Sequence, residues 1–150
     1  MKLDRESLLL HVAADDRFAD VEAYLADRGL GLDVVDAFDG TIGAWLESGA
    51  PGARSAWLDP ADHLIAGFTA RIRSTGASFE IRPAPRRATG PDLGALVLGM
   101  RGRFLALESA WLRVHRLAET RPSTENFTHE EEPLGEAERA LFDAIAEALK

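Results

Sequence analysis

Residues 93–118 read LGALVLGMRGRFLALESAWLRVHRLA, and this stretch decides the fold because two incompatible structures fit it. Its apolar residues recur alternately four and three positions apart, as they do along one side of a long helix. These residues are Leu93, Val97, Met100, Phe104, Leu107, Trp111, Val114 and Ala118. The spacing predicts an all-α bundle with one long central helix over residues 91–119.

Three glycines in the same stretch favour a different structure. Gly94, Gly99 and Gly102 would each cost about 1 kcal/mol in the interior of a helix. Residues 99–102 would instead serve well as the turn of a β-hairpin. The strands would then cover residues 95–98, 103–108 and 111–117. On this interpretation the long helix does not form, and the fold is α+β.

The segments around this stretch combine helix and strand signals. Phe79 and Ile81 alternate with polar residues and predict a strand that ends at Pro83. Residues 33–46 fit either a helix or a hairpin with an Asp39-Gly40 turn, because both structures gather their apolar side chains on one side.

Aspartates placed before apolar stripes predict several helices. Asp4 is a good N-cap for a helix through residues 8–12. Asp59, followed by a first-turn proline, predicts a helix through residues 64–72. Two more helices are predicted through residues 18–25 and 136–149.

The chain has 150 residues, which is enough for a single domain, 1–150, with its own core. An acidic linker at about residues 119–133 precedes the C-terminal helix. No cysteine is present, so disulfides and thiolate metal sites are excluded. The acidic start lacks the pattern of a signal peptide, and no apolar run reaches the roughly 18 residues of a membrane span. We therefore expect a cytoplasmic protein that does not bind membranes.

The net charge of −8 is unevenly distributed. Residues 1–52 hold four basic and eleven acidic residues, residues 53–117 ten and five, and residues 118–150 three and nine. The opposite charges either neutralise one another within the fold, or arginines of the middle segment form an anion-binding patch. Those arginines are Arg82, Arg86, Arg87, Arg101 and Arg103. Nucleic acid is not an expected partner, because an acidic chain with one basic cluster lacks the usual electrostatic footprint.

The order of segments in the last two thirds resembles a known family. The segments are FEIR (79–82), ALVL (95–98), MRGRF (100–104), ESAWLRV (108–114) and ENF (125–127), followed by an alanine-rich helix. Over about residues 59–149 the chain resembles SnoaL-like members of the nuclear transport factor 2-like superfamily. The resemblance implies a curved antiparallel sheet that forms a cone with N-terminal helices, and a mostly apolar pocket at the open end. That family includes isomerases, cyclases and dehydratases as well as non-catalytic domains, so the fold does not settle the function.

Candidate catalytic residues are one histidine and two aspartates. His115 would share a strand face with Trp111 and Arg113. If that face lines the cone, His115 acts as a general base near neutral pH, and Asp36 or Asp39 orients it. An aspartate buried in an apolar cone would have a raised pKa and could itself transfer protons. The alternative is that all three side chains lie on the surface.

Candidate ligand-binding residues are mostly aromatic, because rings with a polar edge suit a pocket for an amphipathic ligand. They are Tyr24, Trp57, His63, Phe104, Trp111 and Arg113. The aromatic residues fit a plain core equally well, and His63 fits a solvated helix. No metal site or cofactor is predicted. His129 is followed by three glutamates, but these residues are consecutive and do not converge on one point.

Two functions from different classes stay open. The first is a small-molecule-binding SnoaL-like cone domain, with proton-transfer chemistry of the isomerase, cyclase or dehydratase type on an apolar or aromatic ligand. The second is a non-catalytic dimerisation or protein-interaction module. The expected partners are such a small molecule and a second copy of the chain. Whether the protein is an enzyme is left open.

Overall fold

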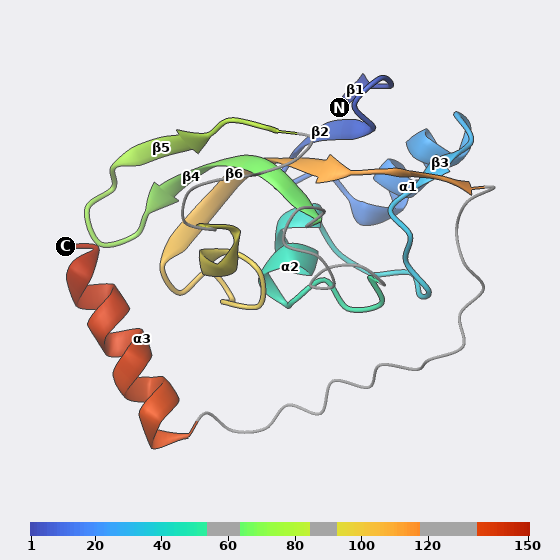
Figure 1. Cartoon of the computed structure of the whole chain (residues 1–150). Coiled ribbons are helices and arrows are strands. Elements are labelled where there is room, and N and C mark those ends of the chain that lie inside the picture. Colours follow the sequence, from blue (N-terminus) through green and yellow to red (C-terminus); the bar gives the residue numbers. More distant parts are fainter. Residues whose placement is uncertain (54–63, 85–92, 118–134) are drawn as a thin grey trace.

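A computed structural model describes residues 1–53, 64–84, 93–117 and 135–150 (Figure 1). Within these residues, five strands form a sheet in the order β1-β2-β6-β4-β5, and β3 pairs with β7 in a second sheet. The strands are β1 Lys2–Asp4, β2 Leu9–Ala13, β3 Leu30–Gly31, β4 Ile65–Ile72, β5 Ser78–Ile81, β6 Leu105–Arg113 and β7 His115–Arg116. The helices are α1 Phe18–Ala26, α2 Ile42–Glu47, the 3₁₀ helix η2 Leu93–Leu96 and α3 Glu136–Ala148. The strand pairings among the described residues are antiparallel and combine with helices, so the α+β class is confirmed.

Strand β6 is the centre of the large sheet, with β2 on one side and β4 on the other. Its buried Ala110 and Leu112 alternate with the half-buried Trp111 and Arg113, which is the period of two expected for a strand with one face on the core. The all-α alternative with a long helix over residues 91–119 is therefore wrong.

The turn before β6 explains why a helix cannot continue through this region. Gly99, Arg101 and Gly102 have φ angles of 77°, 50° and 66°, all in the left-handed region that a right-handed helix excludes. A turn does form at 99–102, but it is not the predicted hairpin turn, because it follows the 3₁₀ helix η2 and not a strand. The predicted strand at 95–98 is wrong, because the amide N–H groups of Val97 and Leu98 both donate to the Gly94 carbonyl and coil the chain.

The N-terminal helix predicted through residues 8–12 is also wrong, because this part of the chain is the β1–β2 hairpin. Asp4 does bind backbone amides as a cap would. Its Oδ1 accepts from the N–H groups of Glu6 and Ser7 at 3.0 and 3.1 Å, but these amides belong to the hairpin turn. The prediction that Asp4 accepts hydrogen bonds from backbone amides therefore holds, but these amides belong to a hairpin turn and not to a helix.

The helix predicted through residues 64–72 is strand β4, which pairs with β6 and β5. Neighbours on both sides complete its backbone hydrogen bonds, and its Phe68 and Ala70 are buried in the core. This tertiary context overrides the cap signal of Asp59, which lies outside the described residues. The predicted strand at Phe79 and Ile81 is confirmed as β5.

Helices α1 and α3 confirm the predictions for residues 18–25 and 136–149. The ambiguous segment 33–46 forms neither a hairpin nor one helix, because α2 begins only at Ile42, where Thr41 Oγ1 accepts from the Ala44 amide at 3.2 Å. Helix α2 lies on one face of the sheet (Figure 1). No helix in the described ranges has the length and apolarity needed to cross a bilayer.

Three large aromatic residues fill the space between the helices and the sheet. Phe18 of α1, Trp45 of α2 and Phe68 of β4 are each exposed by 2% or less, and the Phe18 and Trp45 rings meet edge to face at 5.0 Å. Trp45 Nε1 donates to the Pro51 carbonyl, so its one polar atom is satisfied. This core holds the strands that position the site described below.

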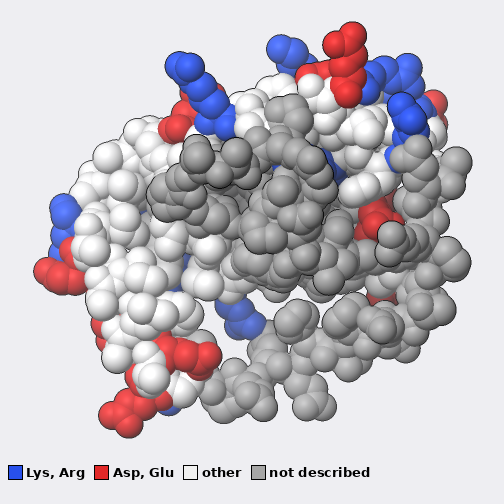
Figure 2. All heavy atoms as spheres, in the orientation of Figure 1, with Lys and Arg blue, Asp and Glu red and all other residues white. Residues whose placement is uncertain are grey.

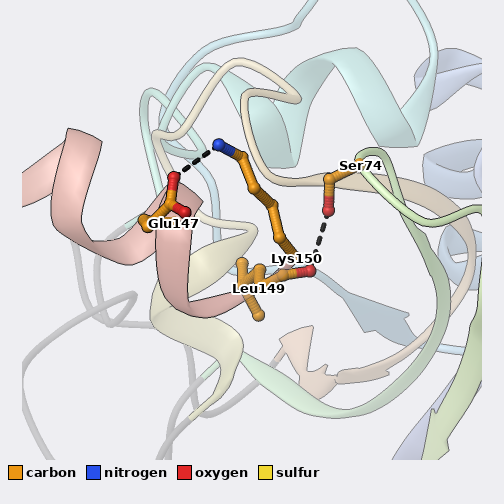
Figure 3. Close-up of polar contacts among 4 residues, drawn as sticks. All are labelled: Ser74, Glu147, Leu149 and Lys150. Atoms are coloured by element: carbon orange, nitrogen blue, oxygen red, sulfur yellow. Dashed lines mark hydrogen bonds and ion pairs between the residues drawn. The ribbon is translucent and has the colours of Figure 1, made fainter.

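Helix α3 packs on the outside of the described fold, and none of its residues is fully buried. The Phe142 ring meets that of Phe104 edge to face at 5.9 Å, and Arg103 pairs with Asp143 at 3.5 Å. Figure 3 shows Ser74, in the turn between β4 and β5, donating a hydrogen bond to the Leu149 carbonyl at the end of the helix. The acidic C-terminal segment thus meets the basic middle segment.

Candidate functional site

The structure does not join the predicted catalytic residues into one hydrogen-bonded unit. His115 lies in β7, opposite Gly31 of β3. The Asp39 side chain is 99% exposed and pairs with Arg17 at 3.3 Å, and Asp36 is also exposed. Among the described residues, no hydrogen bond or ion pair connects His115 with either aspartate. Their catalytic role stays a prediction.

The predicted ligand-binding residues are scattered. Phe104 is buried in the core, and Arg113 Nη2 donates to the Ala84 carbonyl at 3.5 Å. Trp111 is half-buried on β6, and its ring lies 5.0 Å from that of His11 across the β2–β6 pairing. Trp57 and His63 lie outside the described residues.

His11 was not singled out from the sequence, yet it is the histidine in contact with a predicted aromatic wall residue. Partial burial lowers the pKa of His11, and the nearby positive charges of the N-terminal amine and Lys2 lower it further. The imidazole next to Trp111 is therefore neutral at physiological pH. A neutral imidazole that packs at a tilt of 50° against an indole is an ordinary packing contact.

The described residues also form a cleft elsewhere, and we call it the arginine cleft. It has a volume of about 400 Å³ and is lined by Arg5, Leu8, Arg28, Gly29, Leu30 and Arg116. Arg5 comes from the β1–β2 turn, Arg28 follows α1, and Arg116 belongs to β7. Three chain segments that are far apart in the sequence thus each contribute one guanidinium group.

The backbone brings these segments together. In the small sheet Arg116 pairs directly with Leu30, and the Leu117 amide donates to the Gly29 carbonyl at 3.0 Å. The Val114 amide donates to the Leu8 carbonyl, which ties the hairpin turn to the end of β6. The cleft therefore depends on the fold and is not a property of one local segment.

Two of the arginines are held in place by specific contacts. The Arg28 guanidinium stacks on the Tyr24 ring, 3.7 Å from its centroid, and its Nη1 donates to the Tyr24 carbonyl at 2.7 Å. Arg5 Nη2 donates to the Arg28 carbonyl at 3.1 Å. Tyr24 was predicted as a pocket wall, and it instead supports an arginine that lines the cleft. Each guanidinium has five N–H donors, so Arg5 and Arg28 keep donors for a ligand.

The charge of the cleft is opposite to that of the chain. No acidic residue is found among the described residues that line it, although the whole chain carries a net charge of −8. Figure 2 shows that basic and acidic side chains both gather at the upper right of the molecule, over β1 and β3. Arginine stays charged at all physiological pH values, so three guanidinium groups at one cleft favour an anion.

Two lining residues have unusual backbone geometry. Gly29 has a φ of 72°, and a side chain added there would meet nothing within 4 Å, so the cleft is open at this point. Leu8 has a φ of 52°, which is rare for a residue with a Cβ atom and costs roughly 1–2 kcal/mol. Such strain persists only where the surroundings enforce it, and it is found often at functional sites.

The sequence could not have revealed this cleft. The anion-binding patch considered from the sequence involved Arg82, Arg86, Arg87, Arg101 and Arg103, of which Arg86 and Arg87 lie outside the described residues. Arg103 pairs with Asp143 of α3. The three arginines of the cleft carry no shared motif, and only the β3–β7 pairing brings Arg116 to the others. In the described part of the chain, no three histidine or acidic side chains are grouped to hold a metal ion.

The chain matches no protein-family model, and no curated protein resembles it in sequence. Its fold does resemble solved structures. Alkyldihydroxyacetonephosphate synthase, in each of two crystal forms, superposes with a TM-score of 0.61 at 19% sequence identity. The match covers 77% of this chain and 21% of the synthase, so the chain spans about a fifth of that protein's length. At this identity the likeness concerns the fold alone, and the SnoaL-like resemblance stays a prediction.

Proposed function

We propose that this protein binds a small anionic molecule in the arginine cleft. The observation that carries the proposal is the convergence of Arg5, Arg28 and Arg116, from three separate segments, on one cleft without an acidic lining residue in the described part of the chain. Their positive charges attract an anion, and the mutual repulsion of these exposed side chains, which water already screens, falls further when an anion binds between them. Hydrogen bonds from charged donors contribute about 1.5–3 kcal/mol each, which is enough for several arginines to bind one small anion.

The cone-shaped pocket implied by the SnoaL-like resemblance has less support as the ligand site. Phe18, Trp45 and Phe68 occupy the space between helices and sheet, where an apolar ligand of a cone domain would bind. Proton transfer by His115 with Asp36 or Asp39 would also need contacts that join these side chains. An anion at the surface cleft requires no such rearrangement, so a binding role is favoured over a proton-transfer role.

The test is a titration of the full chain with inorganic phosphate, followed by nuclear magnetic resonance of backbone and arginine Nε–H signals. Phosphate should shift the signals of residues around Gly29 and Leu30. Arg28→Gln removes one charged donor and should weaken binding at least tenfold, because about 1.5 kcal/mol is lost. Arg17→Gln is the matched control, because it removes the same charge from an arginine that pairs with Asp39 outside the cleft lining.

The salt dependence gives a second readout of the same site. The arginine side chains are exposed, so their attraction for phosphate should weaken as sodium chloride rises from 50 to 300 mM and the screening length shortens. The proposal fails if phosphate shifts no signals near the cleft, or if Arg28→Gln and Arg17→Gln weaken binding equally.

A second candidate function is the non-catalytic interaction module, in the form of a homodimer. The observation in its favour is that Leu117 and Leu141 are 48% and 58% exposed, and a second copy of the chain could cover such apolar side chains. The oligomeric state in solution tests this candidate.

A further inference from the structure

The arginine cleft is lined by apolar as well as charged side chains, and the apolar side chains indicate what kind of ligand it binds. Leu8 and Leu30 line the cleft together with the three arginines. Leu30 is only 5% exposed and forms part of the floor, whereas Leu8 is half-buried. The apolar surface of these leucines would not help to bind an inorganic anion, because it offers no hydrogen-bond donors.

The volume of the cleft also favours an organic ligand over an inorganic anion. Sites for organic ligands occupy roughly 300–1,000 Å³, and the arginine cleft, at about 400 Å³, falls in this range. An inorganic anion against the guanidinium groups would leave the leucine side of the cleft filled with water. Leu117, which is 48% exposed, lies next to this region because its amide donates to the Gly29 carbonyl.

We infer that the ligand is a phosphate monoester with a short apolar chain, and this inference rests on the proposed function. A phosphate monoester presents three free oxygens and up to two negative charges, which can accept hydrogen bonds from the remaining donors of both Arg5 and Arg28, whereas a carboxylate offers two oxygens and a single charge. Its alkyl chain would lie along Leu8 and Leu30, the two leucines that line the cleft. The same chemistry occurs in free alkyl phosphates and in phosphatidic-acid headgroups.

The experiment is a calorimetric titration of the full chain with inorganic phosphate and with methyl, ethyl, propyl and butyl phosphate. Each methylene buried against the leucines should tighten binding by up to about fourfold, and a cleft open on one side should give at least twofold. Leu8→Asn replaces the apolar wall, and asparagine tolerates the left-handed backbone of this position. It should abolish the chain-length dependence, so that butyl phosphate binds no more tightly than methyl phosphate.

Leu141→Asn is the matched control, because it makes the same change at a leucine of α3 that is 58% exposed and does not line the cleft. It should retain the chain-length dependence. Leu8→Gly, which relieves the positive φ and also removes the wall, replaces Leu8→Asn if that variant does not fold.

The outcomes separate this inference from the proposed function. If inorganic phosphate binds and Arg28→Gln weakens it, but longer alkyl chains bind no tighter, the anion site stands and the apolar chain is refuted. If the chain-length dependence persists in Leu8→Asn, the assigned wall is wrong. If phosphate does not bind at all, both ideas fail.

Co-sedimentation with vesicles of phosphatidic acid, but not of phosphatidylcholine alone, would identify the lipid as the source of the phosphate monoester. Absence of co-sedimentation would identify the free alkyl phosphate.

Discussion

Glu22 of α1 is expected to make the stability of the protein depend on pH. Its Oε1 accepts a hydrogen bond from the Leu32 amide at 3.0 Å, and Leu32 is only 1% exposed, so water cannot replace this acceptor. Burial of the carboxyl group raises the pKa of Glu22 above its ordinary value of 4.5, and the Leu32 hydrogen bond opposes this shift only in part. The contact holds α1 to the residues that follow β3.

The raised pKa fixes the sign of the effect. The folded state binds the Glu22 proton more tightly than the unfolded state, so this group favours folding below its ordinary pKa. That contribution is lost as the pH rises from 4.5 through the raised pKa of the folded state. At neutral pH the protein therefore retains a partly buried carboxylate that costs stability.

Two substitutions separate the hydrogen bond from the charge. Glu22→Ala leaves the buried Leu32 N–H without an acceptor and should lower the free energy of unfolding by about 1–3 kcal/mol. Glu22→Gln keeps an amide oxygen as acceptor and removes the charge, so at pH 7 it should be at least as stable as the natural protein. Urea unfolding between pH 4 and 8, followed by tryptophan fluorescence, measures both. If Glu22→Gln is as unstable as Glu22→Ala at pH 7, the carboxylate itself is required and the reasoning is wrong.

Two further predictions concern the sheet and the oligomeric state. A Cβ atom at Gly67 of β4 would lie 2.6 Å from the Ile81 carbonyl oxygen and 2.7 Å from the Pro83 nitrogen. Gly67→Ala should therefore lower the free energy of unfolding by about 1–3 kcal/mol in urea, and an unchanged midpoint would show that β5 can move away at no cost. Sedimentation velocity from 5 to 200 μM should show a homodimer if the second candidate function holds, and a monomer at every concentration would reject that candidate.

The sequence predicted the helices and strands best where local signals and tertiary packing agree. The stripes of α1 and α3 and the alternation at Phe79 and Ile81 each match the element that formed. Asp4 shows the opposite case, because a carboxylate that caps amides serves a hairpin turn as well as a helix. Nothing in the local sequence tells these two uses apart.

Residues 93–118 misled for a related reason. Their four-and-three spacing is that of a helix, yet β6 places alternate residues on opposite faces and pairs with β2 along one edge and β4 along the other. The three glycines gave the better signal, because the left-handed backbone at Gly99 and Gly102 is incompatible with a continuous helix. In this stretch, the two glycines of the turn therefore predict the structure better than the helical spacing of the apolar residues does.

The candidate site was beyond the reach of the sequence because it depends on register. Arg116 comes near Gly29 only because β7 pairs with β3, and this pairing covers two residues on each strand. A slip of one residue would turn Arg116 to the other face of the small sheet. Tyr24 was recognised as a functional candidate, but its role as a support for Arg28 is visible only in three dimensions.

The surrounding charge gives the cleft a basis for selecting its ligand by size. Residues 1–52 supply Arg5 and Arg28, yet this segment carries eleven acidic and four basic residues. Under the proposal, a long polyanion such as nucleic acid would extend beyond the arginines toward the carboxylates of this acidic segment, which would repel it. A small anion held in the cleft would contact lining residues of which, among those described, none is acidic. The proposal therefore predicts that the protein binds a phosphate monoester in preference to nucleic acid.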